Sequence, residues 1–224
     1  QHEVDFRSAK GVEAADNLNT FKTVVRTVAS NNGLFASFLP KPVDNAVGSG
    51  FYVNLSIKKD GKNIFEGGTF SETGGAFVAG ILNRIVEIAT FLNPLPSSYY
   101  RLGHNDAPLS VSWTRQNRLG QLIRLPFPAG EDEHIEVRAA DPSCNPYLAI
   151  ALLLRAGLEG VENKETIIPA AEDLRAEASW TYGTLPENAE SARKAAAKSK
   201  FVKSVLPEEI VKAYTEFKAE EPEF

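Results

Sequence analysis

Two segments of this chain alternate apolar and polar residues with the two-residue period of a β-strand. The clearer one covers residues 51–57, where Phe51, Val53, Leu55 and Ile57 share one side. Residues 134–139 repeat the pattern. Because successive side chains of a strand point to opposite faces, each segment predicts a strand with one buried and one polar face.

Other segments carry the helical period or a shorter strand signal. Helices are predicted over residues 13–30, 73–91, 146–158, 186–199 and 207–219, and further strands over 1–7, 35–39, 109–113 and 121–127. Strands and helices do not alternate regularly, which favours an α+β fold over a doubly wound sheet. We therefore predict a curved antiparallel sheet with one polar active-site face, flanked by helices.

Composition excludes several classes of protein. Hydrophobic types make up 43% of the 224 residues, which is enough for an ordered core. The net charge of −5 predicts no nucleic-acid partner, and the longest apolar run, Tyr147 to Leu154, is too short to cross a membrane. The single cysteine, Cys144, fits a reducing, cytoplasmic compartment. Because the chain begins at Gln1 and has no methionine, we expect it to be a piece of a longer protein.

The polar side of the predicted strands has two interpretations. Its members are Glu3, Tyr52, Asn54, Arg124, His134, Glu136 and Arg138. In the first interpretation they form the solvated face of an antiparallel sheet, which is common. In the second they line a hollow in which carboxylates hold divalent cations and arginines hold an anion. Four arginines favour an anionic substrate, because a planar guanidinium matches the geometry of carboxylate and phosphate groups. They are Arg101, Arg118, Arg124 and Arg138.

Ordered motifs run along nearly the whole chain. They are Gln1-His2-Glu3-Val4-Asp5-Phe6, Ala15-Asp16-Asn17, Phe38-Leu39-Pro40-Lys41-Pro42, Gly48-Ser49-Gly50, Asn93-Pro94, Ser98-Tyr99-Tyr100-Arg101-Leu102, Gln116-Asn117-Arg118, Glu136-Val137-Arg138, Asp141-Pro142-Ser143, Asn145-Pro146-Tyr147-Leu148 and Gly157 to Lys164. Their order and spacing resemble the catalytic domain of bacterial type I glutamine synthetase. The resemblance implies that residues 1–224 form a single partial catalytic domain, the C-terminal part of a longer chain, with 165–224 as a helical extension.

The resemblance also implies a reaction. In this family ATP phosphorylates the side-chain carboxylate of glutamate, and ammonia then displaces phosphate to give glutamine. The expected cofactors are Mg²⁺ or Mn²⁺, with ATP as co-substrate. The expected partners are glutamate, ammonia and ATP, and copies of the same chain in a ring, expected to be a dodecamer. Because family sites form between neighbouring subunits, we expect the 224 residues alone to fold but to lack synthetase activity.

Roles follow from the resemblance, position by position. Glu3 and Glu136 match carboxylate ligands of the first and second metal, and Tyr52 stands where a further ligand of the second metal is usual. Arg101 and Arg138 match arginines that hold the glutamate carboxylate and the transferred phosphate, beside Gly48 of the substrate loop. The positions that match the ATP site are Asn54, Arg118, Arg124 and His134. The expected catalytic residues are Asp106 on a flap over the intermediate, Arg118 and Arg138.

Four positions depart from the family pattern and keep alternatives open. Tyr52 replaces a histidine, and a phenol is a poor Mg²⁺ ligand at neutral pH because it stays protonated. Val47 replaces an asparagine, Asp106 a glutamate, and His134 an arginine. Three hypotheses follow: a glutamate–ammonia ligase, a γ-glutamyl ligase that uses a polyamine or another amine, and a non-catalytic protein resembling glutamine synthetase. The five retained residues Glu3, Arg101, Arg118, Glu136 and Arg138 favour the first.

Overall fold

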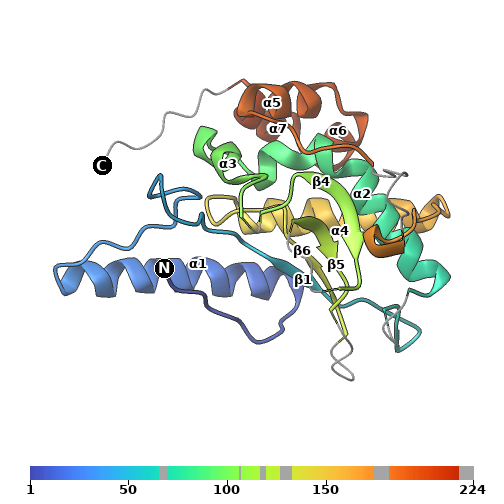
Figure 1. Ribbon diagram of the computed structural model, residues 1–224, viewed down its shortest axis with the longest axis horizontal. Helices are drawn as coiled ribbons and strands as arrows, with labels where there is room; N and C mark the ends of the chain where they lie inside the picture. Colours follow the sequence, from blue (N-terminus) through green and yellow to red (C-terminus); the bar gives the residue numbers. More distant parts are fainter. Residues whose placement is uncertain (66–69, 106, 117–119, 127–132, 174–181, 217–224) are drawn as a thin grey trace.

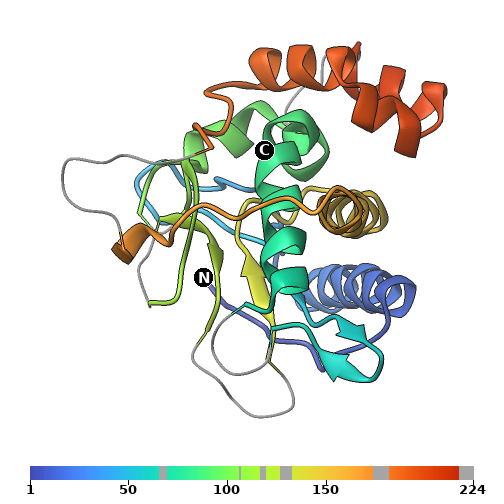
Figure 2. The same ribbon diagram turned by 90° about the vertical axis from the view of Figure 1, so that its right-hand side faces the viewer.

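The computed structural model describes residues 1–65, 70–105, 107–116, 120–126, 133–173 and 182–216. Its elements stack in layers (Figures 1 and 2), with α5 to α7 outermost on one side, then α2, then α4, and α1 on the other side. The helices are α1 (Gly11–Asn31), α2 (Glu72–Leu92), α3 (Pro96–Arg101), α4 (Pro146–Glu162), η2 (Ala171–Asp173), α5 (Ala189–Lys198), α6 (Lys200–Val205) and α7 (Glu208–Thr215). The strands are β1 (Val53–Leu55), β2 (Lys58–Lys59), β3 (Lys62–Asn63), β4 (Ser110–Thr114), β5 (Gln121–Arg124) and β6 (Ile135–Val137).

The larger sheet has the order β1-β6-β5-β4. The β1–β6 and β6–β5 pairs are antiparallel, as predicted, but β4 and β5 run parallel. The expectation of a wholly antiparallel sheet is therefore wrong at this pair, whereas the α+β class is confirmed. Alternation shows which face a side chain takes, and its period is the same in both kinds of pairing, so it says nothing about strand direction.

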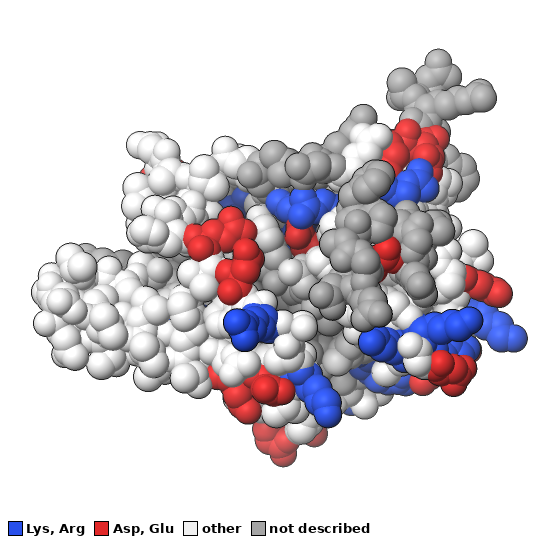
Figure 3. Space-filling model, turned by 90° about the horizontal axis from the view of Figure 1, so that it is seen from below, with Lys and Arg blue, Asp and Glu red and all other residues white. Residues whose placement is uncertain are grey.

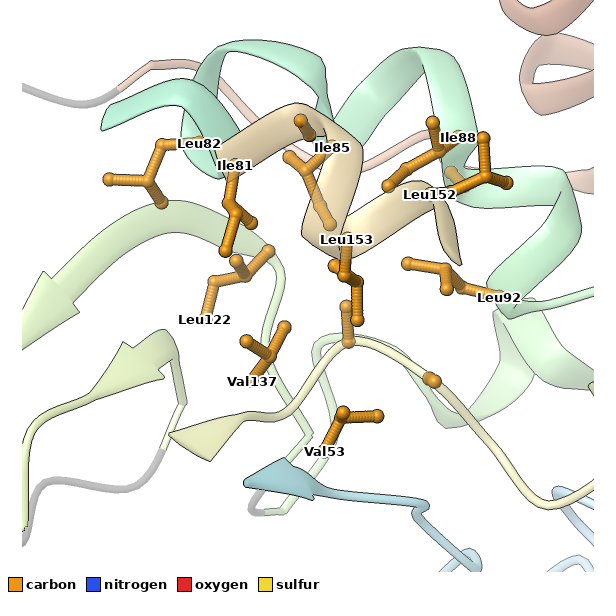
Figure 4. Close-up of a cluster of buried hydrophobic side chains, with 14 of the residues drawn as sticks. Val53, Ile81, Leu82, Ile85, Ile88, Leu92, Leu122, Val137, Leu152 and Leu153 are labelled. Atoms are coloured by element: carbon orange, nitrogen blue, oxygen red, sulfur yellow. The ribbon is translucent and has the colours of Figure 1, made fainter. Parts of the chain in front are cut away.

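The hydrophobic core lies between the sheet and the helix pair α2 and α4. Figure 4 shows Ile81, Ile85 and Leu153 pointing toward Val53 and Val137 of the sheet. The two helices cross where glycines face each other: a methyl group added at Gly80 would lie 2.3 Å from the Ala156 carbonyl oxygen, and one added at Gly160 would lie 2.2 Å from that of Ala76. Since no side chain fits there, the two backbones approach closely and lock the core.

Capping side chains fix where the two core helices begin. The Ser71 hydroxyl accepts a hydrogen bond from the Gly74 amide at 3.0 Å, and Asn145 Oδ1 accepts one from the Tyr147 amide at 3.0 Å. Pro146 occupies the first turn of α4, where its missing amide hydrogen costs nothing. One helix, α2, is long and apolar enough to span a membrane by length and composition, but 78% of that stretch is buried, as in a core helix.

Several predicted elements differ from the structure. Residues 1–7 and 35–39 form no strand, and only Val53–Leu55 of the predicted strand 51–57 has strand geometry, although the Phe51 amide also donates to the Ala140 carbonyl at 2.9 Å. In the first segment Val4 is 51% exposed, and Phe6 packs edge-on against Phe21 at 5.2 Å between ring centroids. Alternation alone does not make a strand, because a strand also needs a neighbour for its backbone hydrogen bonds. The C-terminal region contains α6 in addition to the two predicted helices.

Helix α1 lies on the outside of α4. Lys22 anchors it by donating a hydrogen bond to the Pro142 carbonyl, and burial lowers the pKa of this lysine. The far end of the helix and the turn after it carry exposed apolar side chains: Val24, Val28, Leu34 and Phe35. Seen from below, this end of the molecule shows few charged side chains on its described surface, at the left of Figure 3.

Candidate functional site

Four residues lie side by side across the sheet, one on each strand. Asn54 of β1 is the register partner of Glu136 on β6, Glu136 is the partner of Arg124 on β5, and Arg124 is the partner of Thr114 on β4. The neighbours of Glu136 in sequence, Ile135 and Val137, are 0% and 1% exposed and belong to the core. The predicted polar face of the sheet is therefore present, and it gathers residues from separate parts of the chain.

Two arginines hold the carboxylate at the centre of this face. Arg138 Nη1 donates to Glu136 Oε1 at 2.7 Å, and Arg124 Nη2 donates to Oε2 at 2.9 Å. Glu136 and Arg138 are 7% and 3% exposed. Because charge-assisted bonds shielded from water are strong and oriented, these contacts fix where the two guanidinium groups point. The two guanidinium groups therefore meet at a single carboxylate on the polar face of the sheet.

Tyr52 covers Arg138 from the side of β1. The guanidinium carbon lies 4.4 Å from the centroid of the phenol ring, and Arg138 Nη2 donates to the Tyr52 hydroxyl at 3.2 Å. An arginine over an aromatic face within about 6 Å is stabilised by the ring quadrupole. The position expected to bind the second metal therefore contacts an arginine.

Arg101 is a third arginine near this cluster and is buried, with 3% of its surface exposed. Its Nη2 donates to the backbone carbonyls of Ala139 at 2.8 Å and Ala140 at 3.2 Å, and to Asn93 Oδ1 at 3.3 Å. Burial lowers the pKa of this guanidinium, and the nearby Asp141 carboxylate works in the opposite direction. The acceptors that hold Nη2 are thus all neutral, whereas Nε is buried without a hydrogen-bond partner among the described residues.

The Gly48–Gly50 loop lies directly on Arg101. A methyl group added at Gly48 would be 2.7 Å from Arg101 Cγ, and one added at Gly50 would be 2.8 Å from Tyr52 Cε1 and 3.4 Å from Arg101 Nη1. Gln1 Nε2 donates to the Gly48 carbonyl at 2.9 Å. The loop therefore connects the start of the chain, Arg101 and the Tyr52–Arg138 contact into one site, and glycine is required for this close approach.

The other predicted site residues fall into two groups. His134 is half-buried just before β6, and Glu3 is exposed two residues after Gln1. Asp106 and Arg118 lie outside the described residues. Across the described ranges, no hydrogen bond or ion pair links Glu3 to Glu136, and no three His, Cys, Asp or Glu side chains are grouped so that they could hold a metal ion. Both oxygens of Glu136 accept hydrogen bonds from guanidinium groups, so a divalent cation at this carboxylate would lie beside two positive charges.

A hollow of about 440 Å³ opens beside the glycine loop. It lies between the segment before Gly48 and the turn that follows α3. Its walls are formed by Lys41, Asp44, Asn45, Ala46, Val47, Tyr100, His104 and Asn105. Val47 precedes Gly48 in sequence and Tyr100 precedes Arg101, whereas the wall residues just named include none of the site arginines.

Sequence reasoning missed three residues that support the site. Asn93 accepts the hydrogen bond from Arg101, and Asp141 lies in a buried turn where Ser143 donates to it from both its amide and its hydroxyl. Glu172 accepts hydrogen bonds from the Thr114 hydroxyl and the Arg115 amide, both at 2.8 Å. The Asn-Pro and Asp-Pro dipeptides at 93 and 141 were available as turn signals. Glu172 had no comparable signal, because its partners are more than 50 positions away.

Together these contacts define a candidate anion site. Arg124 and Arg138 converge on one carboxylate, Glu136, and Arg101 lies with Tyr52 under the glycine loop. Preorganised donors of this kind stabilise negative charge that develops on a carboxylate or a phosphoryl group, without reorganising during the reaction.

Known proteins share both the sequence and the fold. The sequence model described as "Glutamine synthetase, catalytic domain" matches residues 1–224. The glutamine synthetase of Methanosarcina mazei is 41% identical over 228 residues, covering 96% of this chain and 50% of the relative. That of Clostridium saccharobutylicum is 44% identical over 178 residues, covering 77% of this chain and 39% of the relative. The chain thus spans about half the length of these curated relatives.

Two solved protein structures have a fold similar to that of this chain. The structure titled "GmaS/ADP complex-Conformation 1" superposes with a TM-score of 0.81 at 27% identity, covering 95% of this chain and 51% of that one. "Apo GmaS without ligand" gives a TM-score of 0.78 at 29% identity, with 94% and 49% covered. With a match along its whole length, this chain belongs to the glutamine synthetase catalytic-domain family.

Proposed function

We propose that this chain supplies part of the catalytic domain of an ATP-dependent glutamate–ammonia ligase, which forms the amide bond of glutamine through γ-glutamyl phosphate. The observation that carries the proposal is the convergence of Arg124 and Arg138 on Glu136, with Arg101 and Tyr52 beside them beneath the Gly48–Gly50 loop. Both substrates are anionic, and such a cluster matches their carboxylate and phosphate groups. The bacterial type I class is part of this proposal, although the relatives include archaeal as well as bacterial proteins.

The residues divide between the two substrates. Arg101 and Arg138, next to Gly48, hold the glutamate carboxylate and the phosphoryl group in transfer. The ATP phosphates and the nucleotide fall to Asn54, Arg118, Arg124 and His134. Phosphoryl transfer depends on position and on neutralising charge more than on covalent chemistry, so guanidinium groups fixed by Glu136 suit it. Asp106 takes the proton from ammonium as the amide forms.

Divalent cations enter with the nucleotide. ATP is used as its Mg²⁺ or Mn²⁺ complex, in which the cation neutralises phosphate charge. We assign Glu3 to this cation, because its exposed carboxylate follows Gln1, which is bonded to the substrate loop. Oxygen ligands of this type are the ones that Mg²⁺ prefers.

The proposal includes an assembly. We infer a cytoplasmic homo-oligomeric ring, a dodecamer, in which residues 1–224 are one partial catalytic domain and 165–224 its helical extension. The exposed apolar residues at the end of α1 support an interface, because such patches on a soluble chain mark contact surfaces. The isolated 224 residues should fold and show no turnover, and any measurable synthetase activity would contradict this.

Phosphate release by the full protein tests the activity. With glutamate, ammonia and magnesium ATP, Arg138→Gln should lower kcat/KM by about 10²- to 10³-fold, the usual loss when one preorganised donor is removed. Arg155→Gln is the matched control, because Arg155 forms an exposed ion pair with Glu162 on the surface of α4. Equal activity in both variants, or release of no phosphate with any amine, would refute a catalytic role.

A second candidate keeps the chemistry but changes the amine. The hollow of about 440 Å³ beside Gly48 has Val47 and Tyr100 in its walls, and it offers apolar surface next to the acid Asp44. A polyamine or another organic amine would use that surface, whereas ammonia would not. The same phosphate-release assay distinguishes the two: if ammonia gives the highest kcat/KM among the amines tested, the second candidate is excluded.

A further inference from the structure

Tyr52 lies beside the polar face, just before β1, and has no role in the proposed reaction. Its ring lies 4.4 Å from the guanidinium carbon of Arg138, and its hydroxyl accepts a hydrogen bond from Nη2 at 3.2 Å. The same residue packs against Gly50, where an added methyl group would lie 2.8 Å from Tyr52 Cε1. The ring is therefore held between the substrate loop and the arginine.

This contact determines which way Arg138 points. With Nη2 on the Tyr52 hydroxyl, Nη1 faces Glu136 Oε1 at 2.7 Å. The planar guanidinium thus has partners from two segments of the chain, Tyr52 just before β1 and Glu136 on β6. Both arginine and carboxylate are more than nine-tenths buried, so water does not compete strongly for either bond.

The arrangement leaves Glu136 unsuited to a divalent cation. Arg138 and Arg124 each take one carboxylate oxygen, at 2.7 and 2.9 Å. A bound Mg²⁺ or Mn²⁺ would need an oxygen at about 2.1 Å, and it would then lie next to two positive groups. Tyr52 adds a neutral phenol on the remaining side, which is a poor replacement for an imidazole or carboxylate ligand.

We propose that Tyr52 is a positioning residue that commits Arg138 to Glu136, and that Glu136 in this chain supports a pair of arginines instead of binding a divalent cation. The inference rests on the proposed function for the identity of the anion, a phosphate or phosphoryl group. The arginine pair then supplies at this position the positive charge that a second cation would otherwise supply.

Metal binding tests the part that concerns Glu136. The number of Mn²⁺ ions bound by the full chain, measured by electron paramagnetic resonance without substrates, should be the same for the wild type and for Glu136→Gln, with affinities within twofold. Loss of one Mn²⁺ site in Glu136→Gln would overturn the inference. If Glu136→Gln does not fold, the Tyr52 variants described next test whether Arg138 is held against Glu136.

Phosphate binding tests the part that concerns Tyr52. With inorganic phosphate as the probe and EDTA present, calorimetry should give Tyr52→Phe an affinity within about threefold of the wild type, because the aromatic face remains. Tyr52→Leu should bind about 10-fold more weakly, the size expected for a desolvated cation–π contact. Tyr147→Leu is the control, since Tyr147 lies on the surface of α4 and is 40% exposed. Equal affinities for Tyr52→Phe and Tyr52→Leu would overturn the positioning role.

The two measurements separate this inference from the proposed function. Neither uses glutamate, ammonia or turnover, so a protein without ligase activity can still give the expected result. Failure of the wild type to bind phosphate at all would count against the proposed function. A Mn²⁺ site lost with Glu136 would count against the inference alone.

Discussion

Helices α2 and α4 approach each other closely at Gly80 and Gly160, and one added methyl group tests how much this approach stabilises the core. Gly160→Ala would place a methyl group 2.2 Å from the Ala76 carbonyl oxygen, whereas an ordinary contact begins at 3.4 Å. The opposing atom is backbone, so it cannot rotate away, and the helices must separate by about 1 Å. Overpacking of this kind costs about 3 kcal/mol, and the better helix propensity of alanine returns up to about 1 kcal/mol.

Urea unfolding followed by circular dichroism measures the difference. A net loss of about 2 kcal/mol should lower the midpoint by about 1 M for a chain with a slope near 2 kcal/mol/M. Gly11→Ala is the matched control, because a methyl group there would lie 3.5 Å from Ile150 Cγ2, an ordinary contact. If Gly160→Ala and Gly11→Ala unfold at the same urea concentration, the close approach of the two helices is not what holds the core.

Three further expectations concern single residues. Gly48→Ala, whose methyl group would lie 2.7 Å from Arg101 Cγ, should raise the KM for glutamate at least 10-fold in the phosphate-release assay, and an unchanged KM would separate the loop from the substrate. Burial raises the pKa of the Cys144 thiol to about 12, so a disulfide reagent at pH 8 should label it only after unfolding; rapid labelling of the native protein would contradict its burial. Although burial opposes ionisation of Glu172, hydrogen bonds from the Arg115 amide and Thr114 lower the pKa of its carboxyl. Its contribution to the free energy of unfolding, measured against Glu172→Gln, should therefore be full above the usual glutamate pKa and be lost as the pH falls through the lowered one, and a difference that does not change with pH would refute it.

Local patterns predicted α1, α2, α4, α5 and α7 but not α3 or α6, and they predicted the polar faces of β1 and β6. The stretch now assigned to α2 was located to within a residue or two, because 3.6-residue periodicity over many turns is a strong signal. The polar face that carries Glu136 also followed from alternation along a single strand. The parallel pairing of β4 and β5 and the absence of a strand at residues 1–7 did not follow, because both depend on which segment lies next to which.

The contacts inside the site also divide into those that the sequence indicated and those that depend on the fold. Motif order and the resemblance brought Arg101 and Arg138 to attention, but neither indicated that Tyr52 would pair with an arginine 86 positions later. A sequence pattern tells which residue types are present, whereas the choice between a metal and a guanidinium for one carboxylate depends on distances of a few tenths of an ångström. Such choices are set by the packing of the whole chain around β1 and β6.

The acceptors bonded to Arg101 show how a protein with a net charge of −5 can hold a positive group beside its polar face. A carboxylate bonded to a guanidinium fixes its position but cancels its charge. Nη2 of Arg101 is bonded instead to the backbone carbonyls of Ala139 and Ala140, whereas Arg124 and Arg138 are each bonded to Glu136. The carbonyls fix the position of Nη2 and carry no net charge that would cancel that of the guanidinium. The carbonyls that do this lie just past the end of β6, where the chain leaves the sheet, so the end of that strand both places Arg101 and preserves its attraction for an anion.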